Sequence, residues 1–378
     1  MKVEDTAELN RAPQLPLFTR RRVVQTALVV LALLIGIYFI FPKLVGLGDA
    51  LSKLHEAEPI WIGVAIGLCI ASFGTYIALF KAVVGGDVLP LTWKETYDIN
   101  MAGVAATLLF SAGGAGGIAL TYWALRKAGM ERRQVGRRMV AFLTLHYAFY
   151  PIALILFGVL LRTGVMNGKD SVELTVIPAA VAGLLLVLGV LIALIPPDLV
   201  GRVAPYAEAH GERARSIAAA IARVPAIVGE GFRFAMGLFA HPRKGGLAVL
   251  GAAGFWATSI GVLWASFHAF GVHVPLAVVV QGFFLGMVAN LFPLAPAGVG
   301  AVDAGMIGAF VLFGLPEDTV FPAILVYRLV AFWLPIPFGA VAFFQLRKTV
   351  QSWEEEGLPI ERVAVDGSGT IKSKVLDF

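Results

Sequence analysis

Two apolar stretches of this chain are each interrupted by glycine or proline, and each half is too short to cross a bilayer. They span residues 101–125, broken at 111–117 (Ser-Ala-Gly-Gly-Ala-Gly-Gly), and residues 276–313, broken at 292–300 (Phe-Pro-Leu-Ala-Pro-Ala-Gly-Val-Gly). A spanning helix needs about 20 residues, and non-helical backbone at membrane depth persists only inside protein or beside a cavity. Paired breaks of this kind mark the binding site in transporters built from inverted repeats.

The composition places the rest of the chain in a membrane as well. Hydrophobic residues make up 58% of the 378 residues, and the mean hydropathy of +0.82 is far above that of a soluble domain. The single cysteine, Cys69, excludes an intramolecular disulfide and a cysteine-based metal site. The net charge of +5 does not indicate a nucleic-acid partner, because the basic residues fall in loops on one side of the predicted topology.

Uninterrupted apolar runs of spanning length and the positions of the basic residues predict the topology. With a cytoplasmic N-terminus, 25 of the thirty Lys and Arg fall inside the cell, four fall outside and Arg328 falls within a span. The positive-inside rule therefore places both termini in the cytoplasm. The six predicted spans are residues 23–41, 60–80, 139–161, 174–195, 247–267 and 320–344.

The charges that flank the two breaks predict hairpins that enter the membrane from opposite sides. The first is flanked by Lys81, Lys94 and a basic loop at 126–138, whereas the segments beside the second, 268–275 and 314–319, hold no Lys or Arg. One kinked spanning helix over residues 95–125 is the alternative for the first break.

The predicted fold class is therefore an all-α polytopic membrane protein with six spanning helices and two oppositely oriented re-entrant hairpins in an inverted repeat. A single membrane domain covers residues 23–348, with half A at 23–161 and half B at 174–345. Residues 1–22 and 349–378 are expected to be cytoplasmic tails. Residues 42–58 and 205–240 carry the apolar and charged faces of interfacial helices.

Two charged residues stand out because they lie within apolar sequence. Asp303, just after the second break, is the only such residue among the 25 Asp and Glu, and Arg328 lies about eight residues into the last span. A charge at this depth is costly and needs a partner or a wet cavity. The two side chains could pair and lock the hairpin to the last helix, or Arg328 could bind an anionic substrate group, for which a guanidinium is well suited.

The breaks offer further groups to an anion, because a helix that begins at a break presents unpaired N–H groups that bind phosphate. His146 joins the candidates because it lies in span 139–161 at a depth similar to that of Arg328, although a satisfied polar residue is its alternative. Asn290 could equally cap backbone groups. The candidate substrate-binding residues are Ser111, Gly113, Gly114, Gly116, His146, Asn290, Pro296, Gly298, Gly300, Asp303, Tyr327 and Arg328.

The second break and the last span resemble a known family. Residues 290–303, Asn-Leu-Phe-Pro-Leu-Ala-Pro-Ala-Gly-Val-Gly-Ala-Val-Asp, followed by Tyr327 and Arg328, are similar to the signature of the flippase-like family. That family is also called the lysylphosphatidylglycerol synthase transmembrane region, or UPF0104. Its signature is a Pro-x-Pro-Gly-Gly-x-Gly-x-x-Glu-like break and then a Tyr-Arg pair in the last helix. The resemblance covers residues 23–348, with a looser match in the first half at 100–126.

The resemblance implies a membrane-embedded lipid translocase, or a partner of lipid and glycolipid biosynthesis. Two positions depart from the family pattern: Asp303 stands where the family usually has Glu, and His146 lies in a helix that often carries Arg. Larger relatives carry a soluble aminoacyl-transfer domain after the membrane region. We expect none here, because the chain ends about 30 residues past its last span.

The expected function is transport of an anionic or polyprenyl-linked lipid headgroup across a bacterial or archaeal cytoplasmic membrane, with Arg328 on the phosphate. A secondary transporter of a small anion and a non-catalytic partner of a lipid or glycolipid biosynthetic enzyme are the alternatives. Enzyme activity, a cofactor, a metal and a nucleic-acid partner are not expected, because no nucleophile–base or metal constellation is visible. A homodimer is left open. No nucleotide-binding loop is present, so transport would be passive or driven by a gradient.

Overall fold

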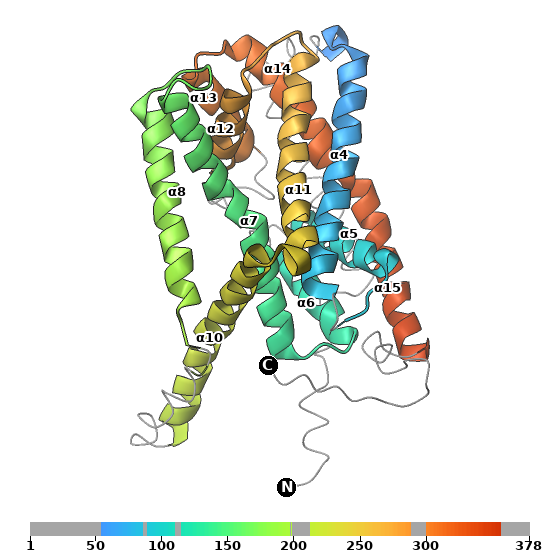
Figure 1. The fold of residues 1–378 in the computed structure, drawn as a ribbon. Helices are drawn as coiled ribbons and strands as arrows, with labels where there is room; N and C mark the ends of the chain where they lie inside the picture. Colours follow the sequence, from blue (N-terminus) through green and yellow to red (C-terminus); the bar gives the residue numbers. More distant parts are fainter. Residues whose placement is uncertain are drawn as a thin grey trace.

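The described part of the chain consists of helices joined by turns and short irregular segments. The computed structural model describes residues 54–85, 89–109, 115–196, 198, 212–288 and 300–356, and no strand occurs in these ranges. The predicted span at 23–41 and most of the predicted link at 42–58 lie outside them. Figure 1 shows the helices as an elongated bundle in which most axes run along its long dimension.

Five segments within these ranges are long and apolar enough to cross a membrane, and they correspond to five of the six predicted spans. Two of them include a π-helical turn, at Lys81–Gly85 after the first and at Leu329–Trp333 in the middle of the last. The segments are α4 (Pro59–Phe80) with its π turn, α7 (Arg132–Arg162), α8 (Val172–Ala193), α11 (Pro242–His268), and α14 (Glu317–Arg328) continued through the π turn into α15 (Pro335–Glu356).

The first broken stretch forms two short helices that fold back on one another, α5 (Trp93–Leu109) and α6 (Ala115–Lys127). A Cβ atom added at Gly117 would lie 2.5 Å from the carbonyl oxygen of Gly103. In one continuous helix these two residues would be about 21 Å apart along the axis. The alternative of a single kinked helix over 95–125 is therefore wrong, and glycine is needed at 117 for the close approach.

The second broken stretch has the same plan, with α12 (Leu276–Met287) and α13 (Ala301–Leu312) packed side by side. A Cβ atom at Gly286 would lie 2.6 Å from Met306 Cα, so these helices also meet through a glycine. The C-terminal end of α13 contacts the α7–α8 connection, where Lys169 Nζ donates to the Leu312 carbonyl oxygen at 2.8 Å. The two helix pairs lie at opposite ends of the bundle (Figure 1).

The buried apolar side chains form two clusters, one around each helix pair. The cluster around α12 and α13 includes Phe267, Phe283 and Phe310. The cluster around α5 and α6 includes Phe80 and Leu125, together with apolar residues near the end of α15. Each helix pair is thus an integral part of the core at its own end of the molecule.

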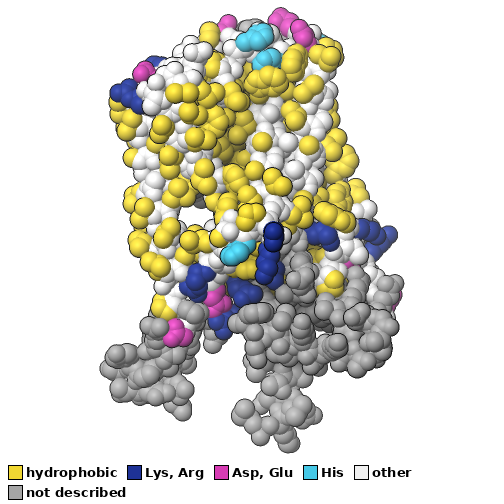
Figure 2. All heavy atoms as spheres, in the orientation of Figure 1, with side chains coloured by type: hydrophobic (Ala, Val, Ile, Leu, Met, Phe, Trp, Pro, Cys, Tyr) yellow, Lys and Arg dark blue, Asp and Glu magenta, His cyan; other side chains and the backbone are white. Residues whose placement is uncertain are grey.

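Charged side chains gather near the two ends, and hydrophobic side chains cover the flank between them (Figure 2). The end that holds α5 and α6 is called the basic end here. Its charges come from the start of α5, the end of α6 and the starts of α7 and α11, and they include Lys94, Arg126, Arg132, Arg133 and Arg243. The helix α10 (Glu212–Ala240) runs obliquely at this end, and Arg233 Nη1 donates to the Ala193 carbonyl oxygen at the end of α8 at 2.8 Å.

Candidate functional site

Asp303 and Arg328 form an ion pair between α13 and α14. Arg328 Nε donates a hydrogen bond to Asp303 Oδ1, and the Arg328 guanidinium lies 5.2 Å from the centre of the Phe332 ring. The side chains are 28% and 13% exposed for Asp303 and Arg328 respectively, so the pair is largely withdrawn from solvent. The sequence left open whether these residues touch, and the structure shows that they do.

The local sequence holds Asp303 in place from its own helix. Gly300 precedes α13 with φ +83°, a conformation that favours glycine, and its N–H donates to Asp303 Oδ2 at 2.9 Å. Asp303 therefore caps the start of α13 with one carboxylate oxygen and receives Arg328 with the other. We call Gly300, Asp303 and Arg328 the Asp303–Arg328 site.

The Asp303–Arg328 site lies well inside the molecule. Arg328 is eleven residues after Glu317, which places it about 16 Å from the N-terminal end of α14. This is about half of the roughly 30 Å hydrocarbon thickness of a bilayer. The N-terminus of α13 points into the same region and contributes partial positive charge there. A guanidinium and a helix N-terminus at this depth form a chemical environment suited to an anion.

The other predicted residues, apart from His146, divide into three groups. Tyr327 is buried in the core, where its ring lies 6.0 Å from that of Phe283, so it packs beside the site and does not line it. Gly116 lies in the first turn of α6, in the other helix pair. Ser111, Gly113, Gly114, Asn290, Pro296 and Gly298 lie outside the described residues.

His146 is separated from the Asp303–Arg328 site by a chain of aromatic rings. Its imidazole is buried and stacks on Trp256 at 5.0 Å, and Trp256 lies 6.1 Å from Phe283, which in turn contacts Tyr327. His146 Nδ1 is buried without a hydrogen-bond partner in the described part of the chain. The structure thus connects His146 to the site through packing alone.

Two buried acids at the basic end were missed by the sequence analysis. Asp98 and Glu95 are 0% and 6% exposed, both lower than Asp303, and both face α15 from α5. Asp303 is the only acid within apolar sequence, but Glu95 and Asp98, which precede the apolar run, are buried by packing between helices. The sequence signal for a role of Glu95 was the Thr92-Trp-Lys-Glu95 motif, which predicts a capping box at the start of a helix.

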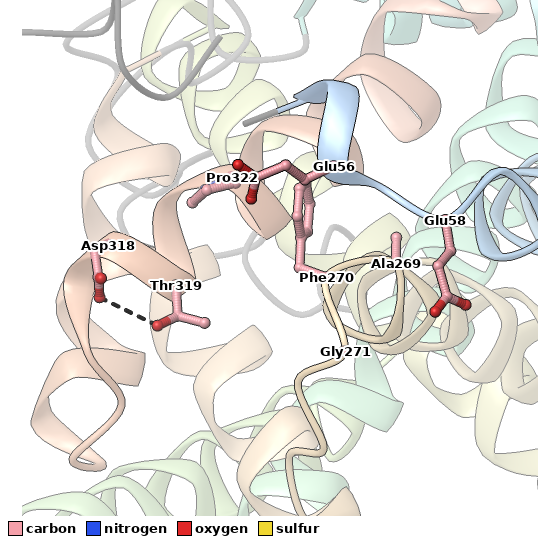
Figure 3. Close-up of a pocket in the computed structure, with 8 residues that line it drawn as sticks. All are labelled: Glu56, Glu58, Ala269, Phe270, Gly271, Asp318, Thr319 and Pro322. Atoms are coloured by element: carbon pink, nitrogen blue, oxygen red, sulfur yellow. Dashed lines mark hydrogen bonds between the residues drawn. The ribbon is translucent and has the colours of Figure 1, made fainter. Parts of the chain in front are cut away.

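A separate pocket of about 410 Å³ lies at the end opposite the basic end (Figure 3). Its lining residues come from the start of α4, the turn after α11 and the first turns of α14, and none of them is a predicted site residue. They include the carboxylates of Glu56, Glu58 and Asp318. Among the described residues, no group of three or more His, Cys, Asp or Glu side chains is arranged to hold a metal ion.

Comparisons with known proteins identify the family. The family described as "Lysylphosphatidylglycerol synthase TM region" matches residues 24–339. A UPF0104 membrane protein of Methanothermobacter thermautotrophicus is 33% identical over 79 residues, which is 21% of this chain and 24% of that protein. A second UPF0104 membrane protein of this organism is 33% identical over 87 residues, 23% of this chain and 26% of its own length. The alignments thus cover about a quarter of the length of these curated relatives. Because the family match covers most of the sequence, the chain is a multi-pass membrane protein that belongs to the lysylphosphatidylglycerol synthase TM region family.

Proposed function

We propose that this chain is a lipid transporter that moves an anionic or polyprenyl-linked lipid headgroup across the cytoplasmic membrane. The observation that carries the proposal is the Asp303–Arg328 site, where a largely buried guanidinium and the N-terminus of α13 meet at mid-depth in the bundle. A buried ionisable residue in a membrane protein is a candidate for substrate binding by default. The family's description as the membrane region of a lipid-modifying synthase supports a lipid as the substrate.

The topology that we propose has six spanning helices and two re-entrant hairpins, α5–α6 and α12–α13, in an inverted repeat. Three observations support it: each pair consists of short helices, each pair folds back through a glycine contact, and the pairs lie at opposite ends of the bundle. The sixth span would be residues 23–41. The basic end would face the cytoplasm together with both termini, in accordance with the positive-inside rule.

In the proposed mechanism, the headgroup phosphate competes with Asp303 for Arg328. A guanidinium can bind two phosphate oxygens at once, and the partial positive charge at the start of α13 adds further attraction. Asp303 keeps its hydrogen bond from the Gly300 N–H during this exchange, so the start of α13 stays capped. Repulsion between phosphate and the nearby carboxylate then favours release. The acyl chains remain in the bilayer while the headgroup crosses.

Arg328→Gln tests this proposal in the reconstituted full-length protein. The vesicles contain phosphatidylcholine and phosphatidylglycerol, with a trace of phosphatidylglycerol that carries a fluorophore which a membrane-impermeant reductant can quench. We expect lipid movement to slow roughly 10- to 100-fold, the loss that follows from removing a charged hydrogen-bond donor. Arg162→Gln is the matched control. Arg162 is 49% exposed and pairs with Asp170 at the end of the bundle that lies opposite the basic end.

The outcomes separate the proposed function from its alternatives. Unchanged lipid movement in Arg328→Gln would contradict the phosphate role of Arg328. If the wild-type protein moves no lipid but takes up inorganic phosphate in an Arg328-dependent manner, the chain is a small-anion transporter. If it does neither, a non-catalytic partner of a lipid-biosynthetic enzyme becomes the better hypothesis.

A further inference from the structure

A buried polar cluster joins α5 to the last turns of α15 at the basic end. Thr349 Oγ1 donates to Asp98 Oδ2 at 2.9 Å, and Trp353 Nε1 donates to Glu95 Oε1 at 2.7 Å. All four side chains belong to residues that are at most 8% exposed. Two polar contacts therefore join α5 to α15 within a region where the two helices otherwise pack through apolar side chains.

The two acids of this cluster differ in how well their oxygens are satisfied. Glu95 Oε2 accepts from Thr92 N at 2.7 Å and from Thr92 Oγ1 at 2.9 Å, which completes a capping box at the start of α5. Asp98 Oδ2 accepts from Thr349 alone, and Asp98 Oδ1 is buried with no hydrogen-bond partner in the described part of the chain. A carboxylate in this position would lose its hydration without replacement.

The charges around Asp98 do not compensate for this burial. On α5, the exposed Lys94 favours the carboxylate and Glu95 opposes it. Among the helices packed against α5, α15 carries the exposed residues Arg347, Lys348 and Glu355, and also Glu354 and Glu356. Arg126 of α6 donates to the Met130 carbonyl oxygen, and Lys81 after α4 donates to that of Leu91. The remaining titratable groups of α5 and α6 are Tyr97, Tyr122 and Lys127.

No ion pair involves Asp98 among the described residues, in contrast to Asp303. Burial raises the pKa of Asp98 above its ordinary value, and the bond from Thr349 and the charge of Lys94 oppose this only in part. The 2.9 Å contact with Thr349 suits both protonation states, because Thr349 can donate to a carboxylate and accept from a carboxyl O–H.

We propose that Asp98 is a proton-binding site, protonated while α5 is packed against α15 and deprotonated when the two separate. Separation would expose the carboxyl group to water at the basic end, where the proton leaves and the anion is hydrated. Repacking of α5 against α15 requires the proton to return. The movement of the α5–α6 pair is thereby linked to proton uptake and release on one side of the membrane.

This site deepens the proposed function by naming the proton as the ion whose binding controls the movement of the α5–α6 pair. The coupling of proton binding to lipid movement rests on that function. The protonation of Asp98 does not rest on it. The two parts can therefore be tested separately, the first on the purified protein without any lipid transport and the second in vesicles.

The first experiment measures the thermal unfolding midpoint of the full-length protein in detergent as a function of pH. A group whose pKa is raised in the folded state stabilises the fold below the ordinary carboxyl value of about 4 and loses this contribution as pH rises through the raised value. We expect the wild-type midpoint to fall by a few degrees over this range. Asp98→Asn, which stays neutral, should not show that fall, whereas Glu355→Gln, at an exposed acid of α15, should match the wild type.

A second variant and a second readout keep the test decisive if Asp98→Asn folds poorly. Thr349→Val keeps Asp98 and removes the hydroxyl that favours its charged form, so the fall in the midpoint should move to higher pH. Infrared spectra recorded at a pH below the fall in the wild-type midpoint should show a protonated-carboxyl band that is absent from Asp98→Asn. A wild-type midpoint with the same pH profile as Asp98→Asn, or the absence of that band, would overturn the proposal.

The coupling is then tested with the fluorescent phosphatidylglycerol in vesicles that hold a pH gradient, imposed by changing the pH on the side that the basic end faces. We expect the gradient to change the rate of lipid movement at least several-fold in the wild type and to have no effect in Asp98→Asn. If the rate of lipid movement in the wild type does not depend on the gradient, coupling is refuted and the transporter proposal stands. If no lipid moves in either protein, the proposed function fails, and the detergent experiment still decides the protonation of Asp98.

Discussion

At the scale of single residues, two buried acids illustrate how burial and partners set the state of a carboxyl group. Asp303 has Arg328 and the Gly300 N–H as partners, one on each carboxylate oxygen. Asp98 has one neutral donor and, among the described residues, no partner for its second oxygen, which favours the protonated form. The sequence revealed the first because it interrupts an apolar run. It concealed the second because Asp98 lies among polar residues whose burial depends on contacts with α15.

Asp303→Ala should destabilise the protein by about 1–3 kcal/mol, since it removes the acceptor of the Gly300 N–H and leaves the Arg328 guanidinium without its carboxylate. Thermal or denaturant unfolding in detergent measures this change. Asp303→Glu, which restores the residue usual in the family, should recover most of the loss and retain lipid movement. Equal stability of Asp303→Ala and wild type would mean that the ion pair contributes nothing to the fold.

At the scale of elements, hydropathy and charge predicted much of the architecture. Five of the six predicted spans are confirmed within a few residues at most ends, because an uninterrupted apolar run of spanning length has few other structures available. The fold-back of α5 on α6 was predicted from the glycine break. Packing between distant segments could not be predicted. One example is the contact of Trp353 with Glu95, and α15 continues past the predicted end at residue 344 to Glu356.

Gly117→Val tests whether the α5–α6 pair depends on the close approach at Gly103. A side chain at position 117 would overlap the Gly103 backbone, which cannot move aside as a flexible side chain could. We expect destabilisation of about 1–3 kcal/mol or a failure to express. Gly183→Val is the matched control, because a Cβ atom at Gly183 on α8 meets no atom within 4 Å. Similar unfolding midpoints for the two variants would show that the helix pair tolerates separation here.

At the scale of the whole molecule, the two helix pairs occupy opposite ends of the bundle. One pair is embedded in the core at the basic end and the other in the core at the opposite end. The Asp303–Arg328 site belongs to one pair and Asp98 to the other. The orientation of the bundle decides on which side of the membrane Asp98 would exchange its proton.

Single cysteines in a Cys69→Ala background test this orientation. Lys169→Cys lies in the α7–α8 connection at the opposite end, and Glu131→Cys lies at the exposed start of α7 at the basic end. With the basic end in the cytoplasm, an impermeant maleimide should label position 169 in intact cells and position 131 only after the membrane is permeabilised. Buried Cys69 should leave little background even in the parent chain. The reverse labelling pattern would invert the topology, and it would place proton release from Asp98 on the outer side of the membrane.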